Sequence, residues 1–207
     1  MFYQYLGSLG SMPERFRKTH LSPPEITRHI RRTVGDSSII IKTARSPAVL
    51  ANQILISGVY DHEDDFIEIS VNYNPQQHAI ELRLVNWAQL AFDVAECIGH
   101  EQVHRKLRKK KSRAYLSEDD EQAYLGNSEE IQAYGFSIAA DLAVHYDGDI
   151  NCLPLADMYQ VYAKTFVHDQ SVMLELEHSA SKYLSNFKGG SHGKQGNGTA
   201  RRTRRRT

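Results

Sequence analysis

The sequence contains few cysteines and no long apolar segment. Its 207 residues include two cysteines, Cys97 and Cys152, too few for the disulfide framework of a small secreted domain. No run of about 18 apolar residues is present, so we expect no transmembrane helix. The first residues also lack the basic and apolar regions of a secretory signal peptide. These absences favour a reducing compartment, and we expect a cytoplasmic protein that makes no membrane contact.

The formal net charge is zero, but the basic and acidic residues are unevenly distributed along the chain. The chain contains 25 Lys and Arg residues and 25 Asp and Glu residues. Residues 188–207 hold seven of the basic residues and no acidic one, which leaves 18 basic against 25 acidic residues in 1–187. We therefore expect a single acidic domain over 1–187. The Gly- and Arg-rich segment over 188–207 cannot bury apolar surface and is predicted to be a disordered basic tail.

The basic side chains of this tail are candidates for weak contact with nucleic acid, because Lys and Arg bind phosphates in a salt-dependent way. The five arginines near its end are Arg201, Arg202, Arg204, Arg205 and Arg206. A tail that only keeps the protein in solution is an equally open alternative. A second basic run covers residues 105–113, where cations would complement the dipole at a helix end or bind a phosphate.

The most informative stretch that the sequence does contain is the HExxH pattern His100-Glu101-Gln102-Val103-His104. Apolar residues recur at helical spacing before it, and we expect a helix over 86–111 with Asn86 as its N-cap. Residues four apart share one face of a helix, so His100 and His104 can direct both imidazoles at one Zn²⁺. Glu101 can then activate a water at the open metal position. The alternative is a pair of ordinary histidines on a helix surface.

A third metal ligand is expected from a second helix that starts near Asn127. Glu130 lies 26 residues after His104, which leaves room for the chain to reverse and for the second helix to pack across the metal. Two alternatives remain open. Asn127 and Glu130 have the spacing of a capping box, in which Glu130 would only cap its own helix. Glu129 is the neighbouring candidate for the ligand.

The remaining pattern predicts an α+β fold. Residues 66–73 and 79–85 alternate apolar and polar side chains around a turn over 74–78, which is typical of a β-hairpin with one buried face. We expect a small antiparallel sheet packed on the HExxH helix, followed by a helical C-terminal half.

Shorter segments complete this expected fold. A further helix is expected from Ser22 to Gly35 and a strand over 38–43, while residues 1–20 read as irregular. Near the C-terminus, residues 155–187 read as one long helix or as two shorter ones.

The HEQVH segment followed by Glu130-Ile131-Gln132-Ala133-Tyr134-Gly135-Phe136 resembles the gluzincin arrangement of HExxH and a downstream ExxA. It is most similar to the ImmA/IrrE-like minimal zinc peptidases, whose second motif reads roughly ExxAxxFA. The resemblance covers about residues 87–142. It implies a zincin-like fold, a two-His, one-Glu zinc site, and a bacterial or phage-encoded regulator acting in a bacterial or phage-infected cell. The chain departs from the family in its basic insert after His104 and in Ser137, where a small Ala is typical.

The sequence therefore predicts a zinc metallopeptidase, a hydrolase of protein or peptide substrates with one Zn²⁺ per chain. His100, His104 and Glu130 would hold the metal, and Glu101 would act as general base. Tyr134 and His145 are candidates for stabilising the transition state or for hydrogen bonding to a ligand; a packed aromatic ring and an exposed helix-end histidine are the alternatives. The non-enzymatic alternative is a zinc-stabilised binding protein that contacts a host factor or nucleic acid. Zinc-water chemistry also leaves a non-peptide substrate open.

Overall fold

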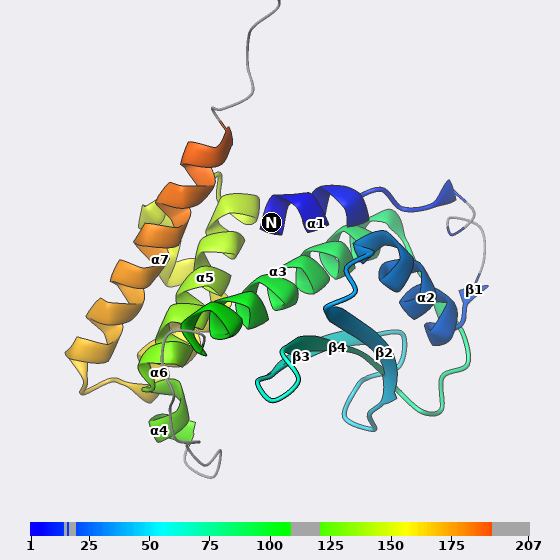
Figure 1. Cartoon of the computed structure of the whole chain (residues 1–207), viewed down its shortest axis with the longest axis horizontal. Helices are drawn as coiled ribbons and strands as arrows, with labels where there is room; N and C mark the ends of the chain where they lie inside the picture. Colours follow the sequence, from blue (N-terminus) through cyan, green and yellow to red (C-terminus); the bar gives the residue numbers. More distant parts are fainter. Residues whose placement is uncertain (15, 17–19, 109–120, 192–207) are drawn as a thin grey trace, which may run out of the picture.

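The computed structural model describes residues 1–14, 16, 20–108 and 121–191. It confirms a mixed α+β fold, and Figure 1 shows the strands gathered on one side of a largely helical molecule. The helices are α1 (Phe2–Leu9), α2 (Pro23–Val34), α3 (Leu84–Arg108), α4 (Glu121–Leu125), α5 (Ser128–His145), η2 (Ile150–Leu155, a 3₁₀ helix), α6 (Asp157–Thr165) and α7 (Gln170–Ser191). The strands are β1 (His20–Leu21), β2 (Ile39–Arg45), β3 (Ile54–Asp61), β4 (Phe66–Tyr73) and β5 (Ile80–Glu81).

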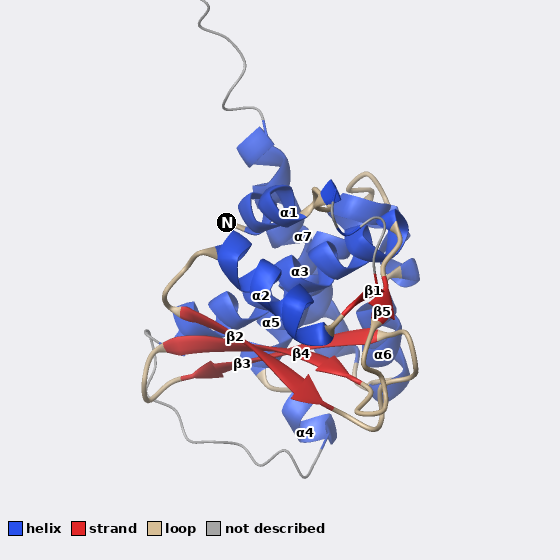
Figure 2. Cartoon of the chain, turned by 90° about the vertical axis from the view of Figure 1, so that its right-hand side faces the viewer, coloured by secondary structure: helices blue, strands red, loops and turns tan. Residues whose placement is uncertain are grey.

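The main sheet has three strands in the order β2-β4-β3 (Figure 2). Strand β4 is parallel to β2 and antiparallel to β3, so the prediction of a purely antiparallel sheet is wrong. The predicted hairpin between 66–73 and 79–85 is wrong too, because β5 pairs with β1 instead. The alternation of apolar and polar residues along β4 predicts a strand with one buried face, but it does not indicate which strand β4 pairs with.

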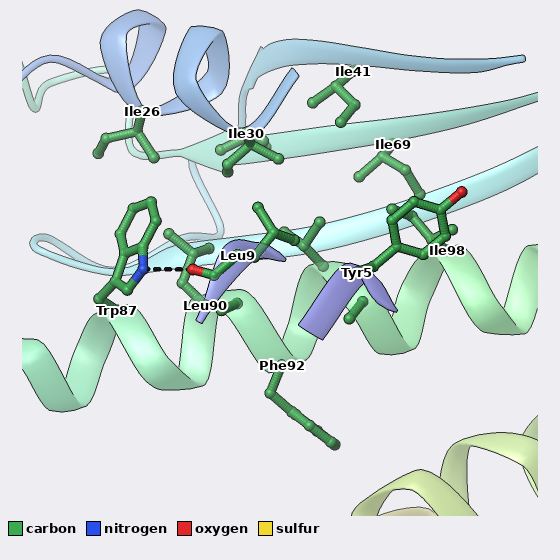
Figure 3. Packing of buried hydrophobic residues seen from close by; sticks show 14 of the residues in the cluster. Tyr5, Leu9, Ile26, Ile30, Ile41, Ile69, Trp87, Leu90, Phe92 and Ile98 are labelled. Carbon is green, nitrogen blue, oxygen red and sulfur yellow. Dashed lines mark hydrogen bonds between the residues drawn. The ribbon is translucent and has the colours of Figure 1, made fainter. Parts of the chain in front are cut away.

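The buried face of the sheet packs on α3. Ile67, Ile69 and Val71 of β4 have no exposed surface, and Ile69 faces Ile98 of α3 in Figure 3. Strand β3 lies at one edge of the main sheet and also contacts α3. The sheet therefore supports the helix that carries the HExxH pattern and places an edge strand beside it.

The N-terminal segment is helical and does not match the expectation of irregular structure. Phe2, Tyr5 and Leu9 of α1 are buried at helical spacing, and the Trp87 indole N–H donates to the Leu9 carbonyl over 2.8 Å (Figure 3). The glycine at position 7 argued against a helix in the sequence. The apolar face of α1 overrides this local preference because it covers the start of α3.

Helix α2 follows its prediction closely, whereas α3 starts earlier than expected and α4 and η2 were not predicted. Helix α2 begins after Ser22 with a capping box and ends at Gly35 in a left-handed conformation. Helix α3 begins at Leu84, so Asn86 lies inside its first turn and is not the N-cap. The C-terminal segment forms two helices, α6 and α7, and α7 continues to Ser191. Residues 109–113 of the basic run and all of 192–207, including the five tail arginines, lie outside the described residues.

Close packing between α3 and α5 depends on Gly99, and we expect Gly99→Ala to destabilise the protein. A Cβ at this position would lie 2.2 Å from Cζ of Phe136, so the two helices must separate or the ring must move. Overpacking of this kind costs about 1–3 kcal/mol, measurable by urea unfolding. Gly7→Ala is the control, because among the described residues no atom beyond its chain neighbours and its own helix backbone lies within 4 Å of its Cβ position. Equal stability of Gly99→Ala and the wild type would contradict this close approach.

Candidate metal centre

Helices α3 and α5 bring three of the predicted side chains together. His100 and His104 project from successive turns of α3, and Glu130 projects from the first turn of α5. The two Nε2 atoms lie 3.2 Å apart. Glu130 Oε2 lies 3.5 Å from Nε2 of His104 and 4.0 Å from Nε2 of His100. One ligand atom from each residue lies within 4.8 Å of the others, and this group could hold a metal ion.

The chemistry of this triad fits a cation. Glu130 is 8% exposed, and its Oε2 has no hydrogen-bond partner among the described residues. A buried carboxylate oxygen without a partner is costly, and a metal ion would satisfy it. Burial, together with the neighbouring His104, lowers the pKa of His100 to about 4. His100 is therefore neutral near pH 7, which is the form that binds a metal.

His104 differs from His100 because it lies closer to Glu130. Burial opposes its positive charge, but the close contact with Glu130 and the charge of that carboxylate outweigh burial and raise the pKa of His104. A proton on His104 therefore takes the place that a cation would occupy in the metal-bound protein. Metal binding must release this proton, so metal affinity is expected to fall as the pH is lowered.

The structure separates the roles of Glu129 and Glu130. The Asn127 side chain caps α5 by accepting from the backbone N–H of Glu129 over 3.0 Å. The Glu129 carboxylate lies 3.7 Å from Nε of Arg108, at the end of α3. Glu130 faces the two imidazoles instead. The geometry thus places Glu130 in the triad and Glu129 in an ion pair beside it.

Ser137 supports His100 from the side opposite the triad. Its hydroxyl donates to the Ala133 carbonyl over 3.3 Å and lies 3.1 Å from Nδ1 of His100. The Ala133 carbonyl and the Glu96 carboxylate are both acceptors for the Ser137 proton, which leaves the Ser137 oxygen to accept from Nδ1–H in the His100 tautomer that carries this proton. This hydrogen bond fixes the tautomer that leaves Nε2 available to a metal. In the sequence, Ser137 was noted only as a departure from the ExxAxxFA motif.

Removal of this support gives a testable result, and we expect Ser137→Ala to lower metal affinity by about 10- to 100-fold. The variant keeps all three ligands but no longer orients the His100 ring. Titration of the metal-free protein with Zn²⁺ in the presence of a competing chelator measures the change. Ser185→Ala is the control, since this exposed hydroxyl bonds only the Ser181 carbonyl of its own helix. An unchanged affinity in Ser137→Ala would mean that His100 is oriented by packing alone.

Glu101 lies beside the triad, on α3, and is 7% exposed. Burial raises its pKa to about 7; the Glu130 charge adds to this effect, while His104 and the backbone N–H of Tyr60 oppose it. A Cβ at Gly58 of β3 would lie 2.9 Å from Cγ of Glu101 and 2.7 Å from Sγ of Cys97. Gly58 thus lets the edge strand approach Glu101 closely.

The contact between β3 and Glu101 was missed from the sequence, because no strand was expected over 54–61. The available signal was a run rich in β-branched and aromatic residues, with Ile54, Ile56, Val59 and Tyr60. Gly58 interrupts the apolar pattern at the point where the strand meets the metal triad, and this made the strand hard to recognise.

Two tyrosines complete the wall of the site. The Tyr134 ring packs edge-on against the His100 ring, with centroids 4.7 Å apart. Burial and the Glu130 charge raise the pKa of Tyr134 to about 12, so its hydroxyl remains a proton donor at neutral pH. Tyr124 of α4, which the sequence reasoning did not single out, hydrogen-bonds to Glu130 and Tyr134. Both tyrosines therefore lie beside the Glu130 member of the triad.

His145 is not part of this group. It lies 15 residues after Glu130, which corresponds to about 22 Å along α5. Its ring packs on Phe92 with centroids 4.8 Å apart, and its Nε2 lies 3.9 Å from Asp141. The structure therefore places this sequence candidate at the far end of the helix that carries the third ligand.

A cavity of about 780 Å³ extends from the metal triad to His145, and His100, Glu101, Tyr134 and His145 all contribute to its wall.

None of the helices in the described part of the chain has the length and hydropathy of a membrane-spanning segment. Comparison of the chain with protein-family models, with curated proteins and with solved structures finds no match.

Proposed function

We propose that the chain is a zinc-dependent metallopeptidase with a zincin-like arrangement of its active-site helix and sheet. One observation carries this proposal: two imidazole nitrogens and a buried carboxylate oxygen lie within 4.8 Å of one another beside Glu101, and His100 and Glu101 line a cavity. Three protein ligands of the types His, His and Glu are typical of a catalytic zinc site that keeps one position open. A structural zinc site would have four protein ligands.

Each side chain has a definite task in this proposal. When bound, Zn²⁺ would polarise the scissile carbonyl and lower the pKa of a water molecule. Glu101 accepts the proton of the attacking water and returns it to the leaving amine. Its pKa of about 7 applies to the metal-free chain, and a nearby divalent cation favours the carboxylate form that accepts a proton. Tyr134 offers a hydroxyl donor to the carbonyl oxygen as it gains negative charge.

The edge strand supports a peptide as the substrate. One side of β3 pairs with β4, and among the described strands nothing pairs with its other side. The backbone N–H of Tyr60 and the close approach at Gly58 place this strand directly beside Glu101. An extended peptide can add to such an edge through main-chain hydrogen bonds. A peptide bond would then lie across the catalytic carboxylate.

Metal analysis tests the proposal directly. Protein purified without chelators is expected to contain about one zinc per chain, because the three ligands are already assembled in the fold. Removal of zinc with a chelator should abolish hydrolysis of an unstructured protein such as reduced casein, and added Zn²⁺ should restore it. Metal-free protein from such a preparation, or full activity in excess chelator, would overturn the proposal.

A further inference from the structure

The cavity at the metal centre continues as a groove between α3 and α5. The lining residues of α3 lie on one face of the helix and include Phe92, Asp93, Glu96 and His100. The facing residues of α5 include Tyr134, Ser137, Asp141 and His145. From His100 back to Gln89, the lined face of α3 measures about 16 Å at 1.5 Å per residue. An extended peptide of about five residues would span this length.

Carboxylates dominate the charge of the groove. Its described lining residues include Asp93, Glu96, Glu101, Asp141 and Asp157, and no Lys or Arg. These residues come from α3, α5 and the first turn of α6, so the charge is collected from three elements. A cleft lined by one sign of charge concentrates its field on a ligand of the opposite sign.

Little on the protein compensates this charge. Asp93 accepts a hydrogen bond from the neutral Gln89 amide over 2.8 Å, and Asp141 lies 3.9 Å from His145. Burial raises the pKa of both Asp93 and Asp141, as expected for acidic groups that lack a strong cationic partner. Mutual repulsion adds to this effect between Asp141 and Asp157.

The acidic part of the groove lies close to the metal triad. His100 and Glu101 line one end of the groove, and His100 is itself a member of the triad. Along α3, Glu96 lies one turn and Asp93 two turns from His100, about 6 and 10 Å at 1.5 Å per residue. A group bound among these acids is therefore close to a bond held at the triad.

We propose that the groove selects peptide substrates with a Lys or Arg side chain within about two residues of the scissile bond. The cationic end group would lie among Asp93, Asp141 and Asp157, and the aliphatic stem would pack on Phe92. This inference rests on the proposed peptidase function, because it places the scissile bond at the metal triad. It adds a substrate class, which the triad itself does not specify.

The first test measures binding without hydrolysis. The full-length chain carrying Glu101→Gln and loaded with Zn²⁺ is titrated with two labelled heptapeptides, Ala-Ala-Ala-Arg-Ala-Ala-Ala and the same peptide with citrulline in place of arginine. Citrulline keeps nearly the same shape but replaces the charged guanidinium, which only donates hydrogen bonds, by a neutral urea group. We expect the arginine peptide to bind at least about tenfold more tightly at low salt, with the difference reduced at high salt.

Charge-neutral variants locate the effect. When Asp93→Asn and Asp141→Asn are combined with Glu101→Gln, the preference for the arginine peptide should disappear. The control pair Asp64→Asn and Glu175→Gln removes the same number of charges from exposed positions outside the groove and should retain the preference. Equal binding of the two peptides, binding of neither, or a preference that survives in Asp93→Asn/Asp141→Asn would overturn the inference.

Cleavage by the zinc-loaded wild type then separates this inference from the proposed function. A random peptide library should be cut mainly beside Lys or Arg, and the cut positions are read by mass spectrometry. Cleavage that shows no enrichment for these residues overturns the substrate inference and leaves the peptidase function standing. Selective binding of the arginine peptide without cleavage of any library member overturns the peptidase function and supports a groove that binds cationic peptides.

Discussion

Glu101→Gln is expected to lower the rate of peptide hydrolysis by about 10²- to 10⁴-fold while the protein keeps its fold and its zinc. Glutamine has nearly the same shape as glutamate, so the packing against Gly58 and the hydrogen bond from the Tyr60 N–H are retained. It cannot accept a proton from water. The loss should therefore be found in kcat, and zinc content measured on the same sample should match the wild type.

This variant also separates the enzyme from a zinc-stabilised binding protein. The fragments that wild-type protein makes in a cell extract, and that Glu101→Gln does not make, identify the natural substrates by mass spectrometry. Gln102→Glu is not a suitable control because it adds charge beside the site. Glu175→Gln, on the exposed face of α7, is the control, because it makes the same Glu-to-Gln change as Glu101→Gln but away from the cavity. A native function that survives Glu101→Gln unchanged would refute the proposed catalytic role.

Glu130→Ala is expected to reduce zinc affinity by more than the 10- to 100-fold that loss of an outer partner costs. Two imidazoles and water would remain, an incomplete site. Zinc raises the melting temperature of any fold that it binds preferentially, so the wild type should gain stability from added Zn²⁺ and Glu130→Ala should gain little. His100→Ala should behave in the same way. Titration against a competing chelator and thermal melts with and without Zn²⁺ measure both effects.

Glu129→Ala is the matched control for this prediction. It removes the neighbouring carboxylate, which lies beside Arg108 and not in the triad. We expect it to lose some stability through the ion pair and to keep zinc and hydrolysis. Loss of a helix cap alone would cost about 1 kcal/mol and would leave zinc affinity almost unchanged. If Glu129→Ala lost the metal and Glu130→Ala showed only a lower melting temperature, the third ligand would be Glu129 and not Glu130.

The sequence by itself determined the features that depend on local spacing. His100 and His104 share a face of α3 because residues four apart on a helix always do so. Apolar periodicity indicated the cores of α3, α5 and α7, and the capping residues placed the ends of α2 at Ser22 and Gly35. The acidic character of the main domain also followed from composition alone. These features need no knowledge of which elements meet in space.

Only the tertiary structure decided which elements meet. Alternation along β4 could not reveal that its partners are β2 and β3, since pairing depends on contacts across the fold. Glu129 and Glu130 are adjacent in sequence, and the packing of α5 on α3 alone determines which of them faces the imidazoles. The same packing brings Ser137 to His100 and places His145 at the far end of the groove. Local sequence fixes the direction of a side chain on its helix, whereas the partner of that side chain depends on long-range packing.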